Sequence, residues 1–273
     1  MFGSNKVSPT KMEYGMFVAK AAALRTLDLS LQVGAAIFSK EGEIVSMGSN
    51  EVPKAGGGTY WCDDPYDDRE FVRGVDSNDR RKNEILSELL EAVERADKIR
   101  DKKVADSQFM YALEYGRIIH AEMSAIVDAA RLGRRTKDTY LFCTTFPCHM
   151  CAKHIVGAGI QNVYFLEPYP KSLVSDLHND SVSVEGNDRG RYSQHPSVVF
   201  EHCFGVSPRR YRELFERGAR KSDGKFSEWA RDEAVPNLYI TSPIYAGFEE
   251  HIVREIIPKY IMKAKFDTCI LDG

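Results

Sequence analysis

The sequence lacks the features of a secreted, membrane-spanning or general nucleic-acid-binding protein. It has no signal peptide and no apolar run near 18 residues, so we expect a cytoplasmic protein without a membrane partner. Its six cysteines show no disulfide-framework spacing. The 37 Lys and Arg do not outnumber the 40 Asp and Glu, and the net charge of −3 argues mildly against a general nucleic-acid binder. This net charge does not exclude a local basic pocket for phosphates.

The chain also lacks internal repeats and a P-loop. Residues 218–225 come near a P-loop, but Phe226 follows Lys225 where Ser or Thr is needed, and the spacing is wrong. We therefore expect no nucleotide-hydrolysing domain in it. At 273 residues, with 43% hydrophobic and 28% charged residues, the chain fits one large globular domain or a domain with an extension.

Two short motifs stand out against this background. Residues 120–122 read His-Ala-Glu, residues 147–151 read Pro-Cys-His-Met-Cys, and residues 123–146 lie between them. An isolated C-x-x-C is often a redox pair or half of a structural zinc site. In this order, however, the two motifs form the H-x-E and P-C-x-x-C signature of zinc nucleobase deaminases.

The residue types of the two motifs suit a catalytic zinc. Such a zinc takes three protein ligands and keeps one position open, which predicts His120, Cys148 and Cys151 as ligands. The cysteines are three apart and share a face if a helix starts there, where the helix dipole favours thiolates. Glu122 is then the proton carrier and not a ligand. Because His120 and Glu122 are two apart, we expect them at the entrance to a helix and not on one face of it.

Several stretches resemble the deoxycytidylate deaminase family over about residues 15–180. They are residues 117–126, which include the first motif, residues 32–37 and residues 48–50. Three further stretches, residues 50–61, 168–173 and 204–208, resemble the deaminase half of bacterial anti-phage dCTP/dCMP deaminases. The resemblance implies an α/β fold of the cytidine deaminase type, a Zn²⁺ cofactor and a homo-oligomer. Anti-phage members usually carry an N-terminal NTPase domain, so that domain or an inhibitory RNA is an expected partner outside this chain.

The resemblance implies hydrolytic deamination of deoxycytidine nucleotides, dCTP or dCMP, to deoxyuridine nucleotides, which would deplete dC nucleotides in anti-phage defence. A housekeeping dCMP deaminase that supplies dUMP for thymidylate synthesis is the alternative. A tRNA or free-base deaminase is a third, and the acidic balance disfavours tRNA. A catalytically silent, zinc-stabilised binding module is the fourth. Glu122 argues against it, since a purely structural site would close the fourth position with a protein ligand.

Six residues are candidate substrate contacts: Asn50, Lys54, Ala121, Arg131, Tyr169 and Lys171. In the resembling family the asparagine matching Asn50 bonds the sugar hydroxyl. The alternative for Asn50 is a turn residue that follows a strand. The arginine matching Arg131 lies near the phosphate or a subunit boundary, or serves as a C-terminal helix charge. Lys54, the glycines at 56–58 and Lys171 would form a phosphate cradle. The glycine run alone indicates a flexible loop.

The remaining cysteines and histidines are assigned structural roles. Cys143 is expected as a buried strand residue, and His149 and His154 as non-ligands. A second zinc site through Cys62 stays open. Phage-type relatives have a cysteine ahead of the first strand where this chain has Asp28, which puts that second zinc in doubt.

Local periodicity predicts the order of the elements. A helix begins at Thr10, a β-hairpin spans 33–48, strands span 139–144 and 162–167, and helices begin near residues 120, 148 and 173, with another strand candidate at 198–204. The alternation predicts a three-layer α/β/α sandwich with a mixed five-stranded sheet. We expect a deaminase domain over 1–185, a helical insertion at about 51–118, and a C-terminal extension, 186–273, packed on the same domain. An amphipathic helix at 79–103 would use its apolar stripe in the oligomer.

Overall fold

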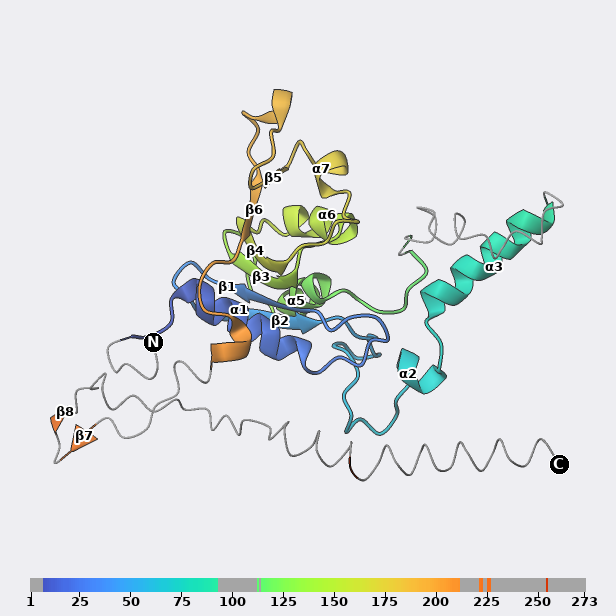
Figure 1. Ribbon diagram of the computed structural model, residues 1–273, viewed down its shortest axis with the longest axis horizontal. Coiled ribbons are helices and arrows are strands. Elements are labelled where there is room, and N and C mark those ends of the chain that lie inside the picture. The colour runs from blue at the N-terminus through green and yellow to red at the C-terminus, as the bar shows by residue number, and fades with distance from the viewer. Residues whose placement is uncertain are drawn as a thin grey trace. The chain divides into compact units, whose positions relative to one another are not determined.

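The fold is built on one mixed β-sheet of six strands in the order β2-β1-β3-β4-β6-β5 (Figure 1). The computed structural model describes residues 7–92, 112, 114–211, 221–222, 225–226 and 254. The strands are β1 (Gly34–Phe38), β2 (Ile44–Ser49), β3 (Tyr140–Thr145), β4 (Asn162–Glu167), β5 (Val182–Val184) and β6 (Val198–His202). β1 pairs antiparallel with β2 and with β3, and β3, β4, β6 and β5 run parallel. The predicted hairpin and the parallel portion are both confirmed.

Helices cover both faces of this sheet. α1 (Lys11–Ala23) covers one face, and α5 (Ala121–Arg131), α6 (His149–Gly157) and α7 (Val174–Leu177) cover the other. α2 (Glu70–Arg73) and α3 (Ser77–Ala92) belong to the insertion. Successive strand side chains point to opposite faces, and β1 shows the result. Ala35 and Ile37 pack in the core that α5, α6 and α7 cover, whereas Ala36 and Phe38 pack in the core that α1 covers. The predicted three-layer α/β/α architecture is confirmed.

The first helix starts where its sequence predicts. Thr10 is its N-cap, and the side chains of Thr10 and Glu13 bond each other's backbone N–H in a capping box. The helix ends at Ala23, although apolar residues continue at helical spacing as far as Leu27. The reason lies in Thr26, whose buried hydroxyl donates to the carbonyl of Asn50 and turns the chain away from the helix axis.

Two details of the sheet and the insertion differ from expectation. The sheet has six strands and not five, because the three-residue β5 and the later β6 pair with each other and β6 pairs with β4. The boundary expected at residue 185 thus falls between two paired strands. The insertion contains α2 and α3; α3 starts at Ser77, and the expected helix beyond Ala92 lies outside the described residues. The oligomer through this helix stays a prediction.

The chain divides into two units, residues 8–211 and residues 1–7 with 212–273. The first unit holds the six-stranded sheet. In the second, the structure describes a short antiparallel pair, β7 (Lys221–Ser222) with β8 (Lys225–Phe226). Across the described part of the chain, no helix combines the length and apolarity needed to cross a membrane.

A glycine lets β2 approach α5 closely. A Cβ at Gly48 would collide with the carbonyl oxygen of Ala121 and the amide nitrogen of Ala125. His120 directly precedes Ala121 as the N-cap of α5. The distance between α5 and β2 therefore also sets the position of the first motif.

We predict that Gly48→Ala lowers the free energy of unfolding by about 1–3 kcal/mol, the usual cost of overpacking a core. Gly157→Ala is the matched control, because a Cβ at that helical position meets no atom within 4 Å. It should leave stability unchanged or raise it by about 0.4–1 kcal/mol. Urea unfolding of both variants measures the difference. Equal stabilities would show that β2 and α5 can separate without penalty.

Candidate active site

Two helices begin beside each other and carry the two motifs. His120 is the N-cap of α5 with extended backbone angles (φ −65°, ψ 154°), and Cys148 is the N-cap of α6 with nearly the same angles (φ −72°, ψ 164°). Cys151 and Glu122 lie in the first turns of α6 and α5. The expectation that His120 and Glu122 stand at the entrance to a helix is therefore confirmed, and the Cys148 helix begins as predicted.

The three predicted ligand side chains form a cluster. The Sγ of Cys148 lies 3.3 Å and the Sγ of Cys151 3.4 Å from Nδ1 of His120, and the three candidate ligand atoms all lie within 4.8 Å of one another. Within the described ranges, this is the group of three metal-ligating side chains that the fold brings together. One imidazole nitrogen and two sulfurs are the donor set of a zinc with a position left open, so these residues fit zinc.

The charges of the cluster favour metal binding. A hydrogen bond from Cys151, and next one from His120, lower the pKa of Cys148 to about 4. The hydrogen bond with Cys148 raises the pKa of His120 to about 9, and the neighbouring thiolate raises the pKa of Cys151. Thiolate is the form that binds a metal, and both helix N-termini stabilise negative charge there.

Glu122 stands beside this cluster without belonging to it. Its side chain is 4% exposed, and its Oε2 accepts a hydrogen bond from the thiol of Cys151 at 3.5 Å. Burial, and then the charge of Cys148, raise the pKa of the Glu122 carboxyl. A carboxyl with a raised pKa takes up and releases a proton near neutral pH more readily than a surface glutamate. The position suits a proton carrier, as the motif predicts.

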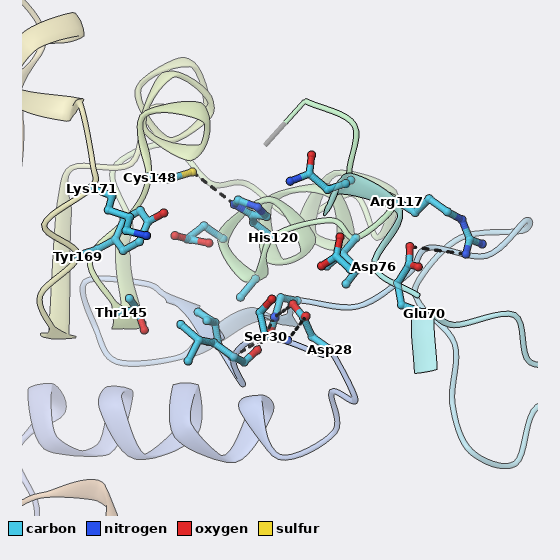
Figure 2. Close-up of a pocket in the computed structure, with 18 of the residues that line it drawn as sticks. Asp28, Ser30, Glu70, Asp76, Arg117, His120, Thr145, Cys148, Tyr169 and Lys171 are labelled. Carbon is cyan, nitrogen blue, oxygen red and sulfur yellow. Dashed lines mark hydrogen bonds and ion pairs between the residues drawn. The ribbon is translucent and has the colours of Figure 1, made fainter. Parts of the chain in front are cut away.

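The cluster opens into a pocket of about 390 Å³ (Figure 2). His120 lies between two groups of side chains: Tyr169 and Lys171 on one side, and Asp76, Glu70 and Arg117 on the other. A third wall is the loop between α1 and β1, together with the end of β2. The volume falls in the usual range of small-molecule sites.

Asn50 lies at this third wall and is almost fully buried. Its Oδ1 accepts from the amide of Val33 at 2.8 Å, and its Nδ2 donates to the carbonyl of Leu31 at 2.7 Å and to a carboxylate oxygen of Asp28. Burial raises the pKa of that Asp28 carboxyl. The amide of Asn50 therefore holds the loop that forms the wall.

The structure separates the other substrate-contact candidates into two groups. Ala121, Tyr169 and Lys171 line the pocket with Asn50. Lys54 pairs with Asp64 at 2.5 Å, and Arg131 pairs with Asp128 at 3.0 Å; neither residue lines the pocket. The predicted cradle of Lys54 and Lys171 is therefore not assembled around the pocket.

The glycine run next to Lys54 is explained by its backbone. Gly56, Gly57 and Gly58 have φ of 89°, 101° and 74°, in the region that favours glycine, and the run turns the chain between the bridged residues Pro53 and Thr59. A Cβ at Gly57 would press against the side chain of Arg131. This supports the loop interpretation of the run.

Several pocket residues could not be found from the motifs. Thr145 and Phe146 end β3 just before the second motif, and their position at the carboxyl end of a parallel strand is the signal that would have found them. Asn78, Lys82 and Arg117 come from the insertion. No local pattern marks Asn78 and Lys82, because only the folding back of the insertion brings them to the pocket. Arg117 lies close to His120 in the sequence, within the stretch 117–126.

The remaining cysteines are placed as follows. Cys143 is fully buried in β3 and donates to the carbonyl of Thr145, as expected of a strand residue. Cys62 is exposed, and in the described part of the chain it belongs to no group of three metal-ligating side chains. His149 and His154 are likewise outside the cluster.

Comparison with known proteins gives consistent matches. The family model described as "Cytidine and deoxycytidylate deaminase zinc-binding region" matches residues 9–167. Deoxycytidylate deaminase of Mus musculus is 30% identical over 169 residues, covering 62% of this chain and 67% of that protein. The enzyme of the same name from Enterobacteria phage T4 is 32% identical over 151 residues, covering 52% and 70%.

Of two further similarities, one is short and the other has low sequence identity. ComE operon protein 2 of Bacillus subtilis is 43% identical over 53 residues, and the chain spans 28% of its length. A solved structure of dCMP deaminase from the cyanophage S-TIM5 with dCMP and dUMP is 18% identical, covers 71% of this chain and 98% of that one, and has a TM-score of 0.41.

We predict that Cys148→Ser and His120→Ala lose bound zinc, because each removes one of three donors. Cys143→Ala is the matched control: it also removes a buried cysteine, but one that lies outside the ligand cluster. Elemental analysis of the purified proteins measures the zinc content directly. Full zinc content in Cys148→Ser would refute the assignment of the ligands.

Proposed function

We propose that this chain, which belongs to the cytidine and deoxycytidylate deaminase zinc-binding family, converts deoxycytidine nucleotides to deoxyuridine nucleotides and ammonia by hydrolysis. One observation carries the proposal: the buried Glu122 stands next to the His120, Cys148 and Cys151 cluster, and all but Cys151 line one pocket. The family match covers residues 9–167 and includes every one of these residues.

The residues divide the chemistry between them. His120, Cys148 and Cys151 would hold the zinc, which when bound acts as a Lewis acid that lowers the pKa of water. Glu122 takes one proton from the attacking water and passes it to the pyrimidine ring nitrogen. It then takes the second proton of that oxygen and passes it to the departing amine, so that ammonia leaves as the carbonyl forms. The raised pKa of Glu122 suits both halves of this transfer. Burial of the carboxyl keeps bulk water from competing for the proton.

The alternative of a silent, zinc-stabilised binding module fits the site less well. A structural zinc site closes its fourth position with a protein ligand. Here the cluster consists of one histidine and two cysteines, Glu122 accepts a hydrogen bond from Cys151, and the cluster faces a pocket large enough for a small molecule. This arrangement supports catalysis.

The number of phosphates and the biological setting are the finer parts of the proposal. The names of the mouse and phage T4 relatives support dCMP as a substrate. The resemblance of residues 50–61 and 168–173 to anti-phage deaminases supports dCTP as well, with depletion of dC nucleotides during infection as the role. The alternative, a housekeeping dCMP deaminase that supplies dUMP, would use the same site but would prefer dCMP over dCTP.

We predict that the purified chain releases uracil nucleotides from dCMP or dCTP and that Glu122→Gln abolishes turnover by removing the proton carrier. Mass spectrometry of the products from cytidine, dCMP, dCDP, dCTP and CTP measures the activity. The variant should keep its full zinc content, which separates loss of proton transfer from loss of metal. An active Glu122→Gln enzyme would refute the mechanism.

A phosphate contact is assigned to the side of the pocket that carries Tyr169 and Lys171. Lys171 is exposed at the pocket lining, next to Tyr169, where its ammonium group can reach a ligand. The exposed position of Lys171 at the pocket lining supports a phosphate contact on this side.

We predict that Lys171→Ala weakens nucleotide use by about 1–3 kcal/mol, the range for a hydrogen bond to a charged group, and leaves deoxycytidine turnover nearly unchanged. Lys54→Ala is the comparison, since Lys54 pairs with Asp64 outside the pocket, and it should change neither. The ratio of kcat/KM for nucleotide over nucleoside gives the result. Equal losses for both substrates in Lys171→Ala would mean that the lysine supports the fold.

A further inference from the structure

The segment that follows β4 carries the pocket side chains Tyr169 and Lys171 on a closed turn. The amide of Ser172 donates to the carbonyl of Tyr169 at 3.0 Å, which closes a β-turn over residues 169–172. The second residue of this turn is Pro170, whose ring fixes the backbone angle φ at a value that suits that position. The backbone that presents Lys171 to the pocket is therefore shaped before any ligand arrives.

Two hydrogen bonds join this part of the chain to the second motif. Before the turn, the carbonyl of Glu167 accepts from the amide of Phe146 at 2.7 Å. At the end of the turn, the hydroxyl of Ser172 donates to the carbonyl of Pro147 at 2.9 Å. Residues 146 and 147 directly precede the first predicted cysteine ligand. A segment attached at one end could swing about that end, whereas the second bond fixes its orientation relative to the motif.

The zinc ligands have a separate support on the other side of Cys148. Nε2 of His178 donates to the carbonyl of His149 at 3.0 Å, which also ties α6 to the chain beyond the turn. Loss of the Ser172 hydroxyl would therefore release the turn and leave the start of α6 held. Ser172 is partly buried and does not line the pocket, so any effect on a ligand must pass through its neighbours.

We propose that Ser172 is a positioning residue for nucleotide binding, whose hydroxyl fixes the 169–172 turn on the second motif and thereby sets the distance from Lys171 to the zinc cluster. The inference rests on the proposed function and on the phosphate contact assigned to Lys171. Figure 2 shows Lys171 and Tyr169 together on one side of His120.

A fixed turn favours nucleotides over the nucleoside. The base lies at the cluster, and a sugar of constant size separates it from the 5′-phosphate. A lysine held at a set distance from the cluster meets that phosphate without first ordering its loop, and preorganisation of this kind increases affinity. Deoxycytidine has no phosphate and gains nothing from the position of Lys171. Ser172 thus contributes to the distinction between nucleotide and nucleoside without touching either.

The test measures kcat and KM for dCMP and for deoxycytidine in Ser172→Ala. We expect KM for dCMP to rise by about 3- to 10-fold, the range for loss of one hydrogen bond, with kcat unchanged within about twofold. The kcat/KM for deoxycytidine should stay within about twofold of the wild-type value. Ser172→Thr keeps a hydroxyl and should return KM for dCMP to the wild-type value.

Thr136→Val is the matched control. The hydroxyl of Thr136 also donates to a backbone carbonyl, that of Ala158, at 2.9 Å, and the residue is also partly buried, but it does not line the pocket or join the turn. This variant should change neither KM. Elemental analysis should find the full zinc content in Ser172→Ala, because the bond from His178 to α6 remains.

A double variant tests whether Ser172 acts through Lys171. If it does, Ser172→Ala added to Lys171→Ala should raise KM for dCMP by no more than about twofold beyond Lys171→Ala alone, because coupled residues show non-additive effects. Losses that add in full would show that the hydroxyl acts by another route and would overturn the proposal.

The remaining outcomes separate positioning from support of the fold. Equal losses for dCMP and deoxycytidine in Ser172→Ala, or loss of zinc, would assign Ser172 to the fold and overturn the proposal. So would a Ser172→Thr enzyme as impaired as Ser172→Ala. Calorimetry with dUMP and deoxyuridine reads the same preference as a ratio of Kd, without turnover. A wild-type chain that binds them but deaminates nothing removes the proposed function, and a drop of this ratio in Ser172→Ala still decides for positioning.

Discussion

The site depends on two helices that begin beside each other at the edge of one sheet. His120 and Cys148 are the N-caps of α5 and α6, so the positions of the ligand atoms follow from where these helices start. β3 leads directly into α6 and so positions Cys148. The close approach of β2 to α5 at Gly48 positions His120. Because interiors are close-packed, a shift of either helix would move a ligand atom out of the cluster.

A buried glutamate that no motif marks joins the elements around this cluster. Glu51 is 1% exposed; its carboxylate accepts from the amides of Leu27 and Val52 and lies 3.7 Å from Arg69. Its backbone bridges to Ile119, the residue before His120. A buried carboxylate without such partners would be costly. Glu51 therefore connects the loop between α1 and β1, the insertion and the first motif through one set of bonds.

The acidic part of the insertion acts mainly through local pairing. Asp67 pairs with Arg69, Asp68 with Arg73 and with Arg117, and Asp79 with Lys82. These ion pairs connect α2, the start of α3 and Arg117, which all contribute residues to the pocket. This pairing explains how a chain with a net charge of −3 places cations at a ligand site without a basic surface.

The sequence alone determined what depends on near neighbours: the two motifs at 120–122 and 147–151, the Thr10 cap, the hairpin, and the starts of α5 and α6. Each is specified by residue types a few positions apart, through capping bonds, strand alternation and ligand spacing. Tertiary structure alone decided which polar side chains meet. It directed Lys54 to Asp64 and Arg131 to Asp128, used the amide of Asn50 inside the wall, added β5 to the sheet, and brought Lys82 to the pocket. A long side chain bonds whichever partner the fold places within a few ångströms. The sequence offers several partners, near ones such as Asp128 included, and only the folded backbone decides which of them is reached.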